Sequence, residues 1–567
     1  MESRQSTQEA ASAGSPVRWT DAVWAVIIQY TQNTTLHGYR YLTEKRRHWM
    51  ERLLWAVVQV AAGVWCARYI LAVYRDYQDT PTATTVESTT HPIWSVPFPA
   101  LAVCNINRIS RAAVAAMAAN MSAATGLDAG RLERLLPLLG RLHETQPGDP
   151  RHPDPRLREL HGALELAAQR ATAAAGEAPY HVTHLMRQLT PKCEQMMVRC
   201  SWLGHTRPCG ELFKLRKTCD GYCCIFNYRR TRDHFGKGTA RIRKVLRVNA
   251  TGPYMGLTVL VDTMTHDYVY PLIASHGLKL LLFKPGDFAD ASSGGLVEKL
   301  LGPRREFFIR LSAQTVDATS EVRSFSPQKR RCLFEDELQE RLGMDYSQSD
   351  CLVSCRIRSI TTLCRCRPFY LPDTGETRVC NLQDIDCLTK YEEKWATPRP
   401  PDGIPGLELE REESIDCPEC LPSCSDVHYT IRANSAPFAP LNGLDTSHPL
   451  LDGVELGNHS IINLYFERAD SVLLRQDVLY YWYDLLSNFG GVCGLFVGAS
   501  LVSSVELVYF ATVRLGQALM GGQSDRAAEA PIHQPQPRSV LPADTVRWQQ
   551  ARRSVRGRLY WREFKPS

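Results

Sequence analysis

The chain has 567 residues, of which 44% are hydrophobic and 22% charged, and its formal net charge is only +6. This length exceeds what one ordinary globular core needs, so we expect two or more regions in different environments. The small net charge, with positive residues that form no single continuous patch, argues against a nucleic-acid-binding protein.

Cysteine is concentrated in one part of the chain: 17 of the 19 cysteines lie between Cys104 and Cys424. This distribution indicates a region that is exposed to an oxidising compartment and forms disulfides. Zinc binding is the alternative, but there are neither two Cys-x-x-Cys pairs at zinc-ribbon separation nor a His-x-x-x-His after a Cys pair. Residues 1–20 lack the apolar stretch of a signal peptide, so we expect an internal membrane segment to deliver this region outside.

The first candidate membrane span covers residues 53–74 and follows a polar N-terminal region, residues 1–52. As a helix this segment would extend about 33 Å, enough for a hydrocarbon core of about 30 Å. Two polar residues interrupt it, Gln59 and Arg68. The Arg68 side chain could extend toward the lipid headgroups or face a partner helix. A buried core helix is the alternative interpretation.

Residues 75–486 lie between the candidate spans and begin with a helical part. Residues 110–189 are rich in Ala, Leu and Arg at helical spacing, and a second helical stretch covers residues 156–175. Pro147, Pro153 and Pro155 separate the helical spacing of Leu132–Leu142 from the second helical stretch, residues 156–175. We expect the helices to form an exposed appendage.

The sequence pattern after the helical part is typical of β-strands. Residues 256–262, 277–283 and 305–316 show alternation and β-branched residues, and residues 459–468 read as a strand that returns toward the membrane. Residues 287–295 are predicted to be a loop. From Cys332 to Cys424 the short cysteine-spaced segments are typical of a structure held by disulfides rather than by a large core.

The second candidate span covers residues 490–513 and contains one acid, Glu506. Gly490, Gly494 and Gly498 repeat every four residues, which permits close approach of helices within a membrane. A phosphate-binding loop is excluded because no Gly-Lys-Ser/Thr follows. Residues 514–567 are rich in Gln, Pro and Arg and are predicted to be a disordered cytoplasmic tail.

Basic residues precede the first span and follow the second, which predicts that both termini are cytoplasmic. They are Arg40, Lys45, Arg46, Arg47 and Arg52 before the first span, and Arg514, Arg547, Arg552, Arg553, Arg556 and Arg558 after the second. The glycosylation sequons at Asn120, Asn249 and Asn458 fall in the region predicted to be extracellular. A fourth sequon, Asn33-Thr34-Thr35, would be cytoplasmic and unused.

Six stretches in order along the chain carry a resemblance to a known family. They are Leu36-His37-Gly38; residues 98–105 (FPALAVCN); residues 221–227 (GYCCIFN); the cysteine series from Arg331 to Cys387; Cys417-x2-Cys420-Leu421-Pro422-x-Cys424; and residues 485–500 (LLSNFGGVCGLFVGAS), running on to Glu506. Together they resemble the degenerin/epithelial sodium channel family, and particularly its arthropod pickpocket branch. The helical insert between Cys104 and Cys193 and the C-terminal tail match poorly.

The resemblance implies an α+β membrane protein: a trimeric channel subunit with two transmembrane helices (residues 53–74 and 487–513) and a large disulfide-rich extracellular domain, residues 75–486, of β-sheet core with peripheral helices. Three second spans would line the pore, with Gly498, Ala499 and Ser500 as the selectivity segment. Small residues there leave room for a narrow passage in which carbonyls and a hydroxyl replace part of an ion's hydration shell. Close packing alone is the alternative role for them.

Other roles follow from the resemblance position by position. His37 and Gly38 correspond to the family's gating pair, Ser487 to a small residue needed for gate closure, and Gly491 to the site of amiloride block. Glu506 is interpreted as a cation-attracting residue near the inner end of the pore, with an interhelical hydrogen bond as the alternative.

The resemblance implies that the extracellular cysteines form disulfides, but their spacing does not give the pairing. The candidates are Cys104, Cys193, Cys200, Cys209, Cys219, Cys224, Cys332, Cys351, Cys355, Cys364, Cys366, Cys380, Cys387, Cys417, Cys420 and Cys424. Because seventeen is odd, at least one thiol must be free or pair between chains, and we expect it within the adjacent pair Cys223-Cys224. Cys66 and Cys493 are interpreted as small apolar residues of the spans. Asn488 stands where acid-sensing members have Asp, which weakens a proton-gated interpretation.

The predicted function is therefore a subunit of a sodium-selective, amiloride-sensitive, ligand- or mechanically gated channel of the plasma membrane. Its partners would be the lipid bilayer, related subunits in a homo- or heterotrimer, and an extracellular ligand that the sequence does not identify. Sodium is the permeant ion, and no cofactor, metal or nucleic acid is expected. A membrane-anchored receptor is the second hypothesis, disfavoured by the polar, glycine-rich second span. An ectoenzyme is the third, but no Gly-x-Ser-x-Gly or His-Glu-x-x-His is present.

Overall fold

The computed structural model describes residues 19–143, 154–171, 180–229, 244–337, 345–373, 375, 377–400, 403–438, 450–451, 454 and 457–520. The chain divides into two units, one of Met1–Arg68 with Phe489–Ser567 and one of Tyr69–Asn488. The predicted tail, residues 514–567, lies outside the described residues from residue 521 onward.

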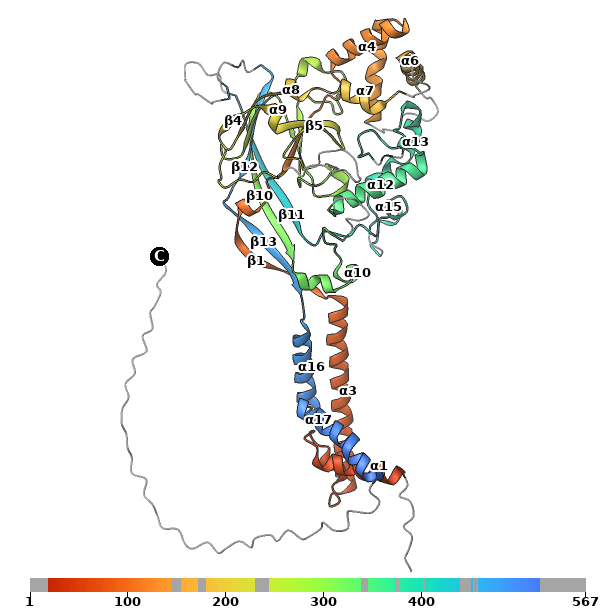
Figure 1. Ribbon diagram of the computed structural model, residues 1–567, viewed down its shortest axis with the longest axis vertical. Coiled ribbons are helices and arrows are strands. Elements are labelled where there is room, and N and C mark those ends of the chain that lie inside the picture. Colours follow the sequence, from red (N-terminus) through yellow and green to blue (C-terminus); the bar gives the residue numbers. More distant parts are fainter. Residues whose placement is uncertain are drawn as a thin grey trace, which may run out of the picture. The chain divides into compact units, whose positions relative to one another are not determined.

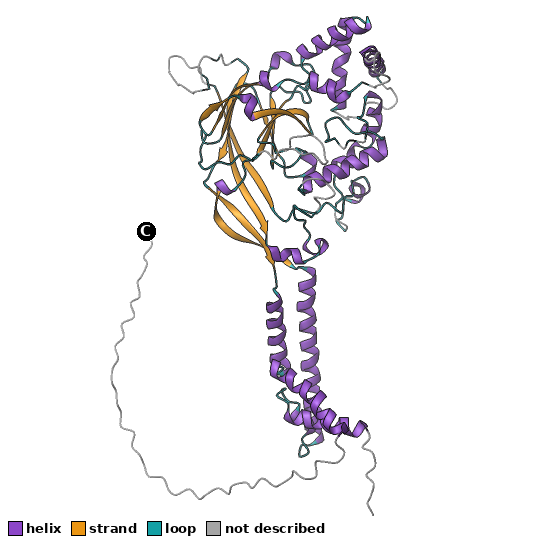
Figure 2. Ribbon diagram, in the orientation of Figure 1, coloured by secondary structure: helices purple, strands orange, loops and turns teal. Residues whose placement is uncertain are grey.

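The larger sheet of the Tyr69–Asn488 unit has eight strands (Figure 2). Its centre is β10 (Arg305–Ala318), which pairs antiparallel with β11 (Asp426–Pro437) and parallel with β12 (His459–Phe466) and then with β13 (Asp470–Val478). The sheet continues from β12 to β7 (Leu257–Asp262), β3 (Met197–Trp202) and β4 (His205–Arg207), and from β13 to β1 (Thr82–Pro92).

A second sheet of five strands has the order β5-β6-β2-β8-β9. Its members are β5 (Phe213–Thr218), β6 (Gly221–Phe226), β2 (Ala100–Asn105), β8 (Leu278–Phe283) and β9 (Val297–Leu301). The strands predicted at residues 256–262, 277–283, 305–316 and 459–468 correspond to β7, β8, β10 and β12, and these four predictions are confirmed.

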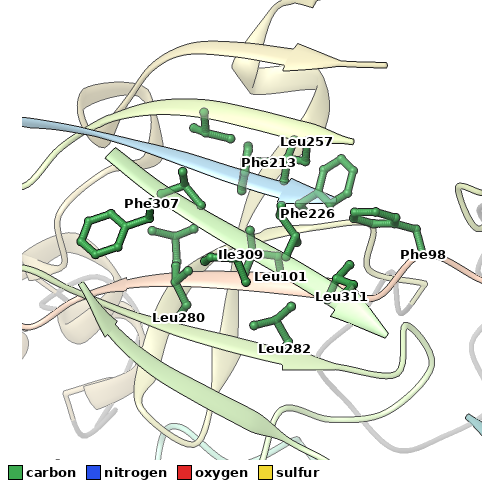
Figure 3. Close-up of a cluster of buried hydrophobic side chains, with 14 of the residues drawn as sticks. Phe98, Leu101, Phe213, Phe226, Leu257, Leu280, Leu282, Phe307, Ile309 and Leu311 are labelled. Carbon is green, nitrogen blue, oxygen red and sulfur yellow. The ribbon is translucent and has the colours of Figure 1, made fainter. Parts of the chain in front are cut away.

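One hydrophobic core joins side chains from both sheets (Figure 3). Along β10 the buried residues alternate, as a strand with one face on the core requires: Phe307, Ile309 and Leu311 point inward. Phe98, just before β2, is fully buried, and its ring meets those of Phe226 and Phe466 edge-on. These rings contribute both apolar burial and favourable edge-to-face geometry.

The helical part between β2 and β3 has its own hydrophobic core. Its elements are α4 (Arg111–Thr125), α5 (Ala129–Leu135), η2 (Leu136–Leu142), α6 (Pro155–Ala171) and α7 (Val182–Leu189). Ser110 and Asp128 cap the first two helices by accepting a backbone N–H of the first turn. Leucines of this core pack with Phe369 and Leu382 from the cysteine-rich part. The helices lie at the outside of this unit, as predicted, but their inner faces pack on the cysteine-rich part (Figure 1).

The part from Cys332 to Cys424 is more regular than predicted. It contains α12 (Gln348–Cys364), a helix of 17 residues, and a buried cluster in which Val353, Ile357 and Ile360 lie beside the cysteines. Shorter elements complete this unit: η1 (Ile93–Ser95), α8 (Cys193–Met196), α9 (Cys209–Leu212), η3 (Thr265–Asp267), η4 (Ala291–Ser293), η5 (Ser320–Ser324), α10 (Pro327–Arg330), η6 (Leu382–Asp384), α13 (Ile385–Lys390), α14 (Glu392–Ala396) and α15 (Glu408–Glu412). Helix packing and disulfides thus stabilise this part together.

Eight disulfides are formed, all within the Tyr69–Asn488 unit. The pairs are Cys104–Cys223, Cys193–Cys224, Cys200–Cys209, Cys332–Cys424, Cys351–Cys420, Cys355–Cys417, Cys364–Cys387 and Cys366–Cys380. Two predictions need correction, because Cys219 is free and both members of the pair Cys223-Cys224 are bonded. Cys223 and Cys224 follow each other on β6, so their side chains point to opposite faces of the sheet and reach different partners.

Two apolar helical segments have the length to cross a membrane. α3 (Trp49–Asp79) has 31 residues and extends beyond the predicted 53–74 at both ends. The second segment is a bent pair, α16 (Trp482–Val497) and residues 501–519, with 70° between the two parts. It begins before the predicted residue 490, and the helix is interrupted at residues 498–500, within the predicted span 490–513. The remaining helices are α1 (Trp19–Asn33), α2 (Arg40–Thr43), α17 (Leu501–Tyr509), the π-helical η7 (Phe510–Arg514) and α18 (Leu515–Met520).

Candidate functional site

The interruption of the second apolar segment coincides with the small residues Gly498, Ala499 and Ser500. Helix α16 ends at Val497, and Ser500 caps α17 in a reciprocal arrangement with Ser503, each side chain bonding the other residue's backbone N–H. Gly498 has φ +73°, a left-handed conformation that side chains disfavour. The local sequence therefore ends one helix and starts another at the segment that the resemblance singles out.

The N-terminal segment that carries His37 and Gly38 lies against this interruption, within the same unit. The backbone N–H of His37 donates to the Val497 carbonyl at 3.0 Å, which satisfies an acceptor at the end of α16. The His37 ring occupies the space where a Cβ on Gly498 would stand, at 2.5 Å from that position. Only glycine therefore fits at 498, by conformation and by space.

Gln59 of α3 holds the same segment from the other side. Its Nε2 donates to the His37 carbonyl oxygen at 2.6 Å. Gly38 has φ +78°, and a Cβ there would collide with the Gln59 amide. The pair His37-Gly38 thus lies between α3 and the start of the interruption, which explains why a small residue follows the histidine.

Glu506, half-buried on α17, also contacts the N-terminal segment. Its Oε2 accepts from the backbone N–H of Thr35 at 3.2 Å and from the Thr35 hydroxyl at 3.1 Å. Thr35 Oγ1 lies 2.8 Å from the hydroxyl of Ser503, which is buried. The structure thus brings Glu506, His37, Gly38 and the segment 498–500 together.

Ser487 and Gly491 lie elsewhere on α16, and both are exposed. A Cβ at Gly490 or Gly491 would meet no atom within 4 Å, whereas one at Gly494 would touch the Ala499 carbonyl. Within the described residues of one chain, no contact therefore links Ser487 or Gly491 to the interruption.

Three residues of the site were missed by sequence reasoning: Thr35, Gln59 and Ser503. A signal existed for Gln59, because a polar side chain within an apolar span needs a partner. Thr35 appeared only as part of an unused sequon, and Ser503 resembles an ordinary small helical residue. Neither pattern contains information about a partner more than 400 positions away.

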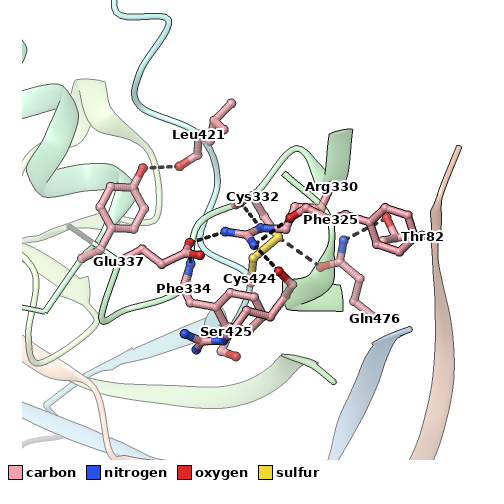
Figure 4. The surroundings of a disulfide bond; sticks show 12 residues. Thr82, Phe325, Arg330, Cys332, Phe334, Glu337, Leu421, Cys424, Ser425 and Gln476 are labelled. Atoms are coloured by element: carbon pink, nitrogen blue, oxygen red, sulfur yellow. Dashed lines mark hydrogen bonds and ion pairs between the residues drawn. A yellow bond between two sulfur atoms is a disulfide. The ribbon is translucent and has the colours of Figure 1, made fainter. Parts of the chain in front are cut away.

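Another group of interactions surrounds the disulfide Cys332–Cys424 (Figure 4). The buried guanidinium of Arg330 donates to the Cys332 carbonyl at 2.9 Å and pairs with Glu337. Gln476 of β13 contacts the Cys332 sulfur through Oε1 and the Thr82 hydroxyl of β1 through Nε2. The disulfide is therefore connected to the two paired strands that follow α3 and precede α16 in the chain.

The end of α3 contacts the same part of this unit. The ring of Tyr77 meets that of Phe325 edge-on at 5.8 Å between centroids, and Lys329 bonds Gln78. Both partners precede Cys332 in sequence: Phe325 lies between η5 and α10, and Lys329 lies in α10. The cysteine-rich part thus contacts the C-terminal end of α3 as well as β1 and β13.

Acidic residues gather around the start of α12. Burial, together with the neighbouring Asp350 carboxylate, raises the pKa of Asp287 to about 7. Asp350 is buried and accepts the backbone N–H of Phe288 at 3.0 Å. Lys284 lies 3.3 Å from Glu335 and 3.4 Å from Asp426, and it opposes the rise in the Asp287 pKa. The pKa of the Asp287 carboxyl therefore lies near neutral pH.

Modification and metal sites can be judged from exposure and bonding. Asn120 and Asn249 are exposed, and Asn458 is half-buried. Among the described residues, one group has the ligand spacing of a metal site, Cys366, Cys380 and Asp384. Its two sulfurs form a disulfide, so no thiolate is available there to bind a metal.

Comparison with known proteins agrees with these features. Residues 30–510 match the family "Amiloride-sensitive sodium channel". The chain is 25% identical over 507 residues to Sodium channel protein Nach of Drosophila melanogaster, with 86% of each chain covered. It is 24% identical to Pickpocket protein 28 of the same species, covering 87% of this chain and 79% of that one. It is also 24% identical to Acid-sensing ion channel 2 of Danio rerio, covering 74% and 70%.

The matched region contains His37, Gly38, the interruption at 498–500, Glu506 and all eight disulfides. The family consists of ion channels and not of enzymes. The chain belongs to the degenerin/epithelial sodium channel family and is one of its arthropod pickpocket-like members.

Proposed function

We propose that this protein is a subunit of a sodium-selective channel of the plasma membrane, with two spans, cytoplasmic termini and a trimeric pore lined by the second span. The observation that carries the proposal is the non-helical segment Gly498–Ser500 inside an apolar segment. Irregular backbone at membrane depth is tolerated where it lines a cavity or is buried in protein. There its carbonyls and the Ser500 hydroxyl can replace water around an ion.

The exposed apolar surface of the spans supports the same proposal. Leu53, Val57, Val60, Val64 and Leu71 of α3 are all exposed in a single chain, as are Leu501, Val505 and Val508 of α17. Such surfaces are stable only when covered by lipid or by other subunits. We infer that Ser487 lies at the gate and Gly491 at the amiloride site, and that Asn120, Asn249 and Asn458 carry glycans. The stimulus is a ligand or force that acts on the extracellular domain.

The test is whole-cell current in oocytes that express the chain with and without Ser487→Phe. A bulky side chain at an exposed position of α16 should obstruct closure and bypass the stimulus. The expected result is an inward current that disappears when external sodium is replaced and decreases with amiloride. No current from either form, with surface expression shown by labelling, would contradict a homomeric channel. Coexpression with related subunits would then test a mixed trimer.

A further inference from the structure

Two of the three free cysteines of this chain face each other within the unit of residues 1–68 and 489–567. Cys66 lies on α3 and Cys493 on α16, and their sulfur atoms are 3.8 Å apart. Cys66 is the one side chain that α3 buries in a single chain, and Cys493 is half-buried. The side chain that α3 buries therefore lies against a second thiol.

This arrangement gives the two cysteines a chemistry that neither has alone. A single buried cysteine behaves as a small apolar residue, which is the role expected for both from the sequence. In a disulfide the sulfurs are about 2.05 Å apart, so these two, now at 3.8 Å, must approach by roughly 1.8 Å through side-chain rotation. The cysteines of the other unit are already paired, apart from Cys219. Cys66 and Cys493 are thus each other's available partner within one chain.

The surface around the pair is apolar. Val64 and Trp65 beside Cys66, and Leu495 two residues after Cys493, are all exposed in a single chain. The proposed function places these side chains in the hydrocarbon of the bilayer. A charged, water-soluble thiol such as glutathione enters such a medium at high cost, whereas a hydroperoxide on an oxidised acyl chain is part of it. The oxidant that fits this pair is therefore an apolar organic hydroperoxide.

We propose that Cys66 and Cys493 form a redox-active pair, a modification site that an apolar organic hydroperoxide converts into a disulfide between α3 and α16. The sulfur of Cys493, the less buried of the two, attacks the terminal peroxide oxygen; the O–O bond breaks, and the organic part leaves as an alcohol with the thiol proton. The Cys66 sulfur then attacks the resulting sulfenic acid, the S–O bond breaks, and water leaves with the second thiol proton. The two thiols thereby lose two electrons, and the peroxide gains them.

The bond would act on the turn of α16 that leads into the interruption at residues 498–500. The Cys493 carbonyl accepts the backbone N–H of Ala499 at 3.2 Å, and the Gly494 carbonyl accepts that of Gly498 at 3.0 Å. A disulfide at Cys493 therefore fixes to α3 the part of α16 whose carbonyls bond the interruption. Its effect on current rests on the proposed function, in which this backbone lines the pore. The pair itself can be tested without any current.

The first experiment detects the bond in the full-length chain, in membranes of cells that express it. A protease site is inserted after residue 440, between β11 and β12, and Cys493 is the only cysteine beyond it. The membranes are treated with cumene hydroperoxide, the remaining thiols are blocked with N-ethylmaleimide, and the cleaved chain is run on a non-reducing denaturing gel. The two fragments should stay joined after peroxide treatment and separate after dithiothreitol. Separate fragments from treated parent chain that has reached the cell surface would overturn the pair.

Matched variants identify the partner of Cys493. Cys66→Ala and Cys493→Ala should each leave the fragments separate, whereas Cys219→Ala should behave as the parent chain does. Val492→Cys combined with Cys493→Ala should not link, because the preceding residue of the helix points about 100° away. Equal linking in the Cys66→Ala form would assign the bond to another cysteine and overturn the pair.

Coexpression separates a bond within one chain from a bond between two copies. Chains with Cys66→Ala and chains with Cys493→Ala, produced together, hold one member of the pair each and should give no joined fragments. Joined fragments in this mixture, or a dimer of the C-terminal fragment from the parent chain, would show a bond between copies and overturn the pair within one chain.

The second experiment tests the consequence for current in oocytes that express Ser487→Phe. Cumene hydroperoxide should reduce the sodium current, because the disulfide holds α16 against α3, and dithiothreitol should restore it. The same treatment should leave the current of Ser487→Phe/Cys493→Ala unchanged. Joined fragments without a change in current would overturn the coupling to the interruption. Absence of current in every form would count against the proposed function, and the gel would still decide the pair.

Discussion

The two units of this protein are stabilised by different chemistry. Tyr69–Asn488 contains eight disulfides and several buried hydrophobic clusters. In the other unit, described over residues 19–68 and 489–520, the buried side chains are Ala22, Val26, Cys66 and Ser503. Its two cysteines, with sulfurs 3.8 Å apart, form no disulfide, and hydrogen bonds join its segments.

The hydrogen-bonded unit can therefore change its conformation at a lower free-energy cost than the disulfide-bonded unit. Covalent links and dense packing keep one shape, because altering them requires broken bonds or cavities. A segment held by a few hydrogen bonds, each contributing about 1 kcal/mol net, can exchange its partners readily. We therefore expect conformational change to be easier within the hydrogen-bonded unit than within the disulfide-bonded unit.

The largest effect should follow from breaking a disulfide that closes a long loop. Cys332→Ser/Cys424→Ser removes a link across a sequence separation of 92 and should reduce the free energy of unfolding by about 4 kcal/mol. The measurement is thermal unfolding of the solubilised full-length chain. Cys219→Ser is the matched control, because this cysteine is free and should leave the unfolding midpoint nearly unchanged. Equal destabilisation by both changes would contradict the pairing.

A smaller effect is expected at the interruption of the second apolar segment. Gly498→Ala forces a side chain into a left-handed conformation, at about 1–2 kcal/mol, and into the space of the His37 ring. The N-terminal segment should be displaced, and sodium current in the Ser487→Phe background should be lost. Gly490→Ala, whose Cβ would meet no atom within 4 Å, is the control and should conduct. Unfolding of the Tyr69–Asn488 unit should be unaffected in both.

The acidic group at α12 should give that unit a pH dependence near neutrality. The pKa of Asp287 is raised in the folded protein, so its protonated form stabilises the fold below pH 4, and that contribution is lost as pH rises through about 7. Between pH 6 and pH 8 the free energy of unfolding should fall by about 1 kcal/mol. Asp287→Asn should abolish this part of the dependence, measured as the unfolding midpoint against pH. An unchanged slope in this variant would show that another group titrates.

The smallest effect should come from a single hydrogen bond within the less stable unit. Gln59→Leu removes the donor to the His37 carbonyl and should weaken docking of the N-terminal segment by about 1 kcal/mol. The rate of cross-linking between cysteines introduced at positions 35 and 503 should therefore fall, while disulfides of the other unit stay intact. An unaltered rate would indicate that the contacts at Thr35 alone hold the segment.

Sequence patterns predicted some parts of the Tyr69–Asn488 unit better than others. Alternation and β-branched residues identified β7, β8, β10 and β12 as strands. Only β10 has the alternating burial of a strand with one buried face, whereas β7, β8 and β12 are buried on both faces. The same reasoning could not find the core of the helical part, since helical spacing gives a buried face without naming what covers it. Cysteine counting predicted disulfides correctly but misplaced the free thiol, because pairing depends on which sheet face each residue occupies.

The family, the two apolar segments, the oxidised cysteine-rich region and the small residues at 498–500 could all be identified from the amino-acid sequence alone. These features are local, or depend on spacing along the chain. Three features became visible only in the folded chain: Cys219 is free, the second apolar segment bends at Gly498, and Thr35, His37 and Gln59 meet there. These contacts join residues more than 20 and up to 471 positions apart, and distance in space between such residues is set by folding of the whole chain.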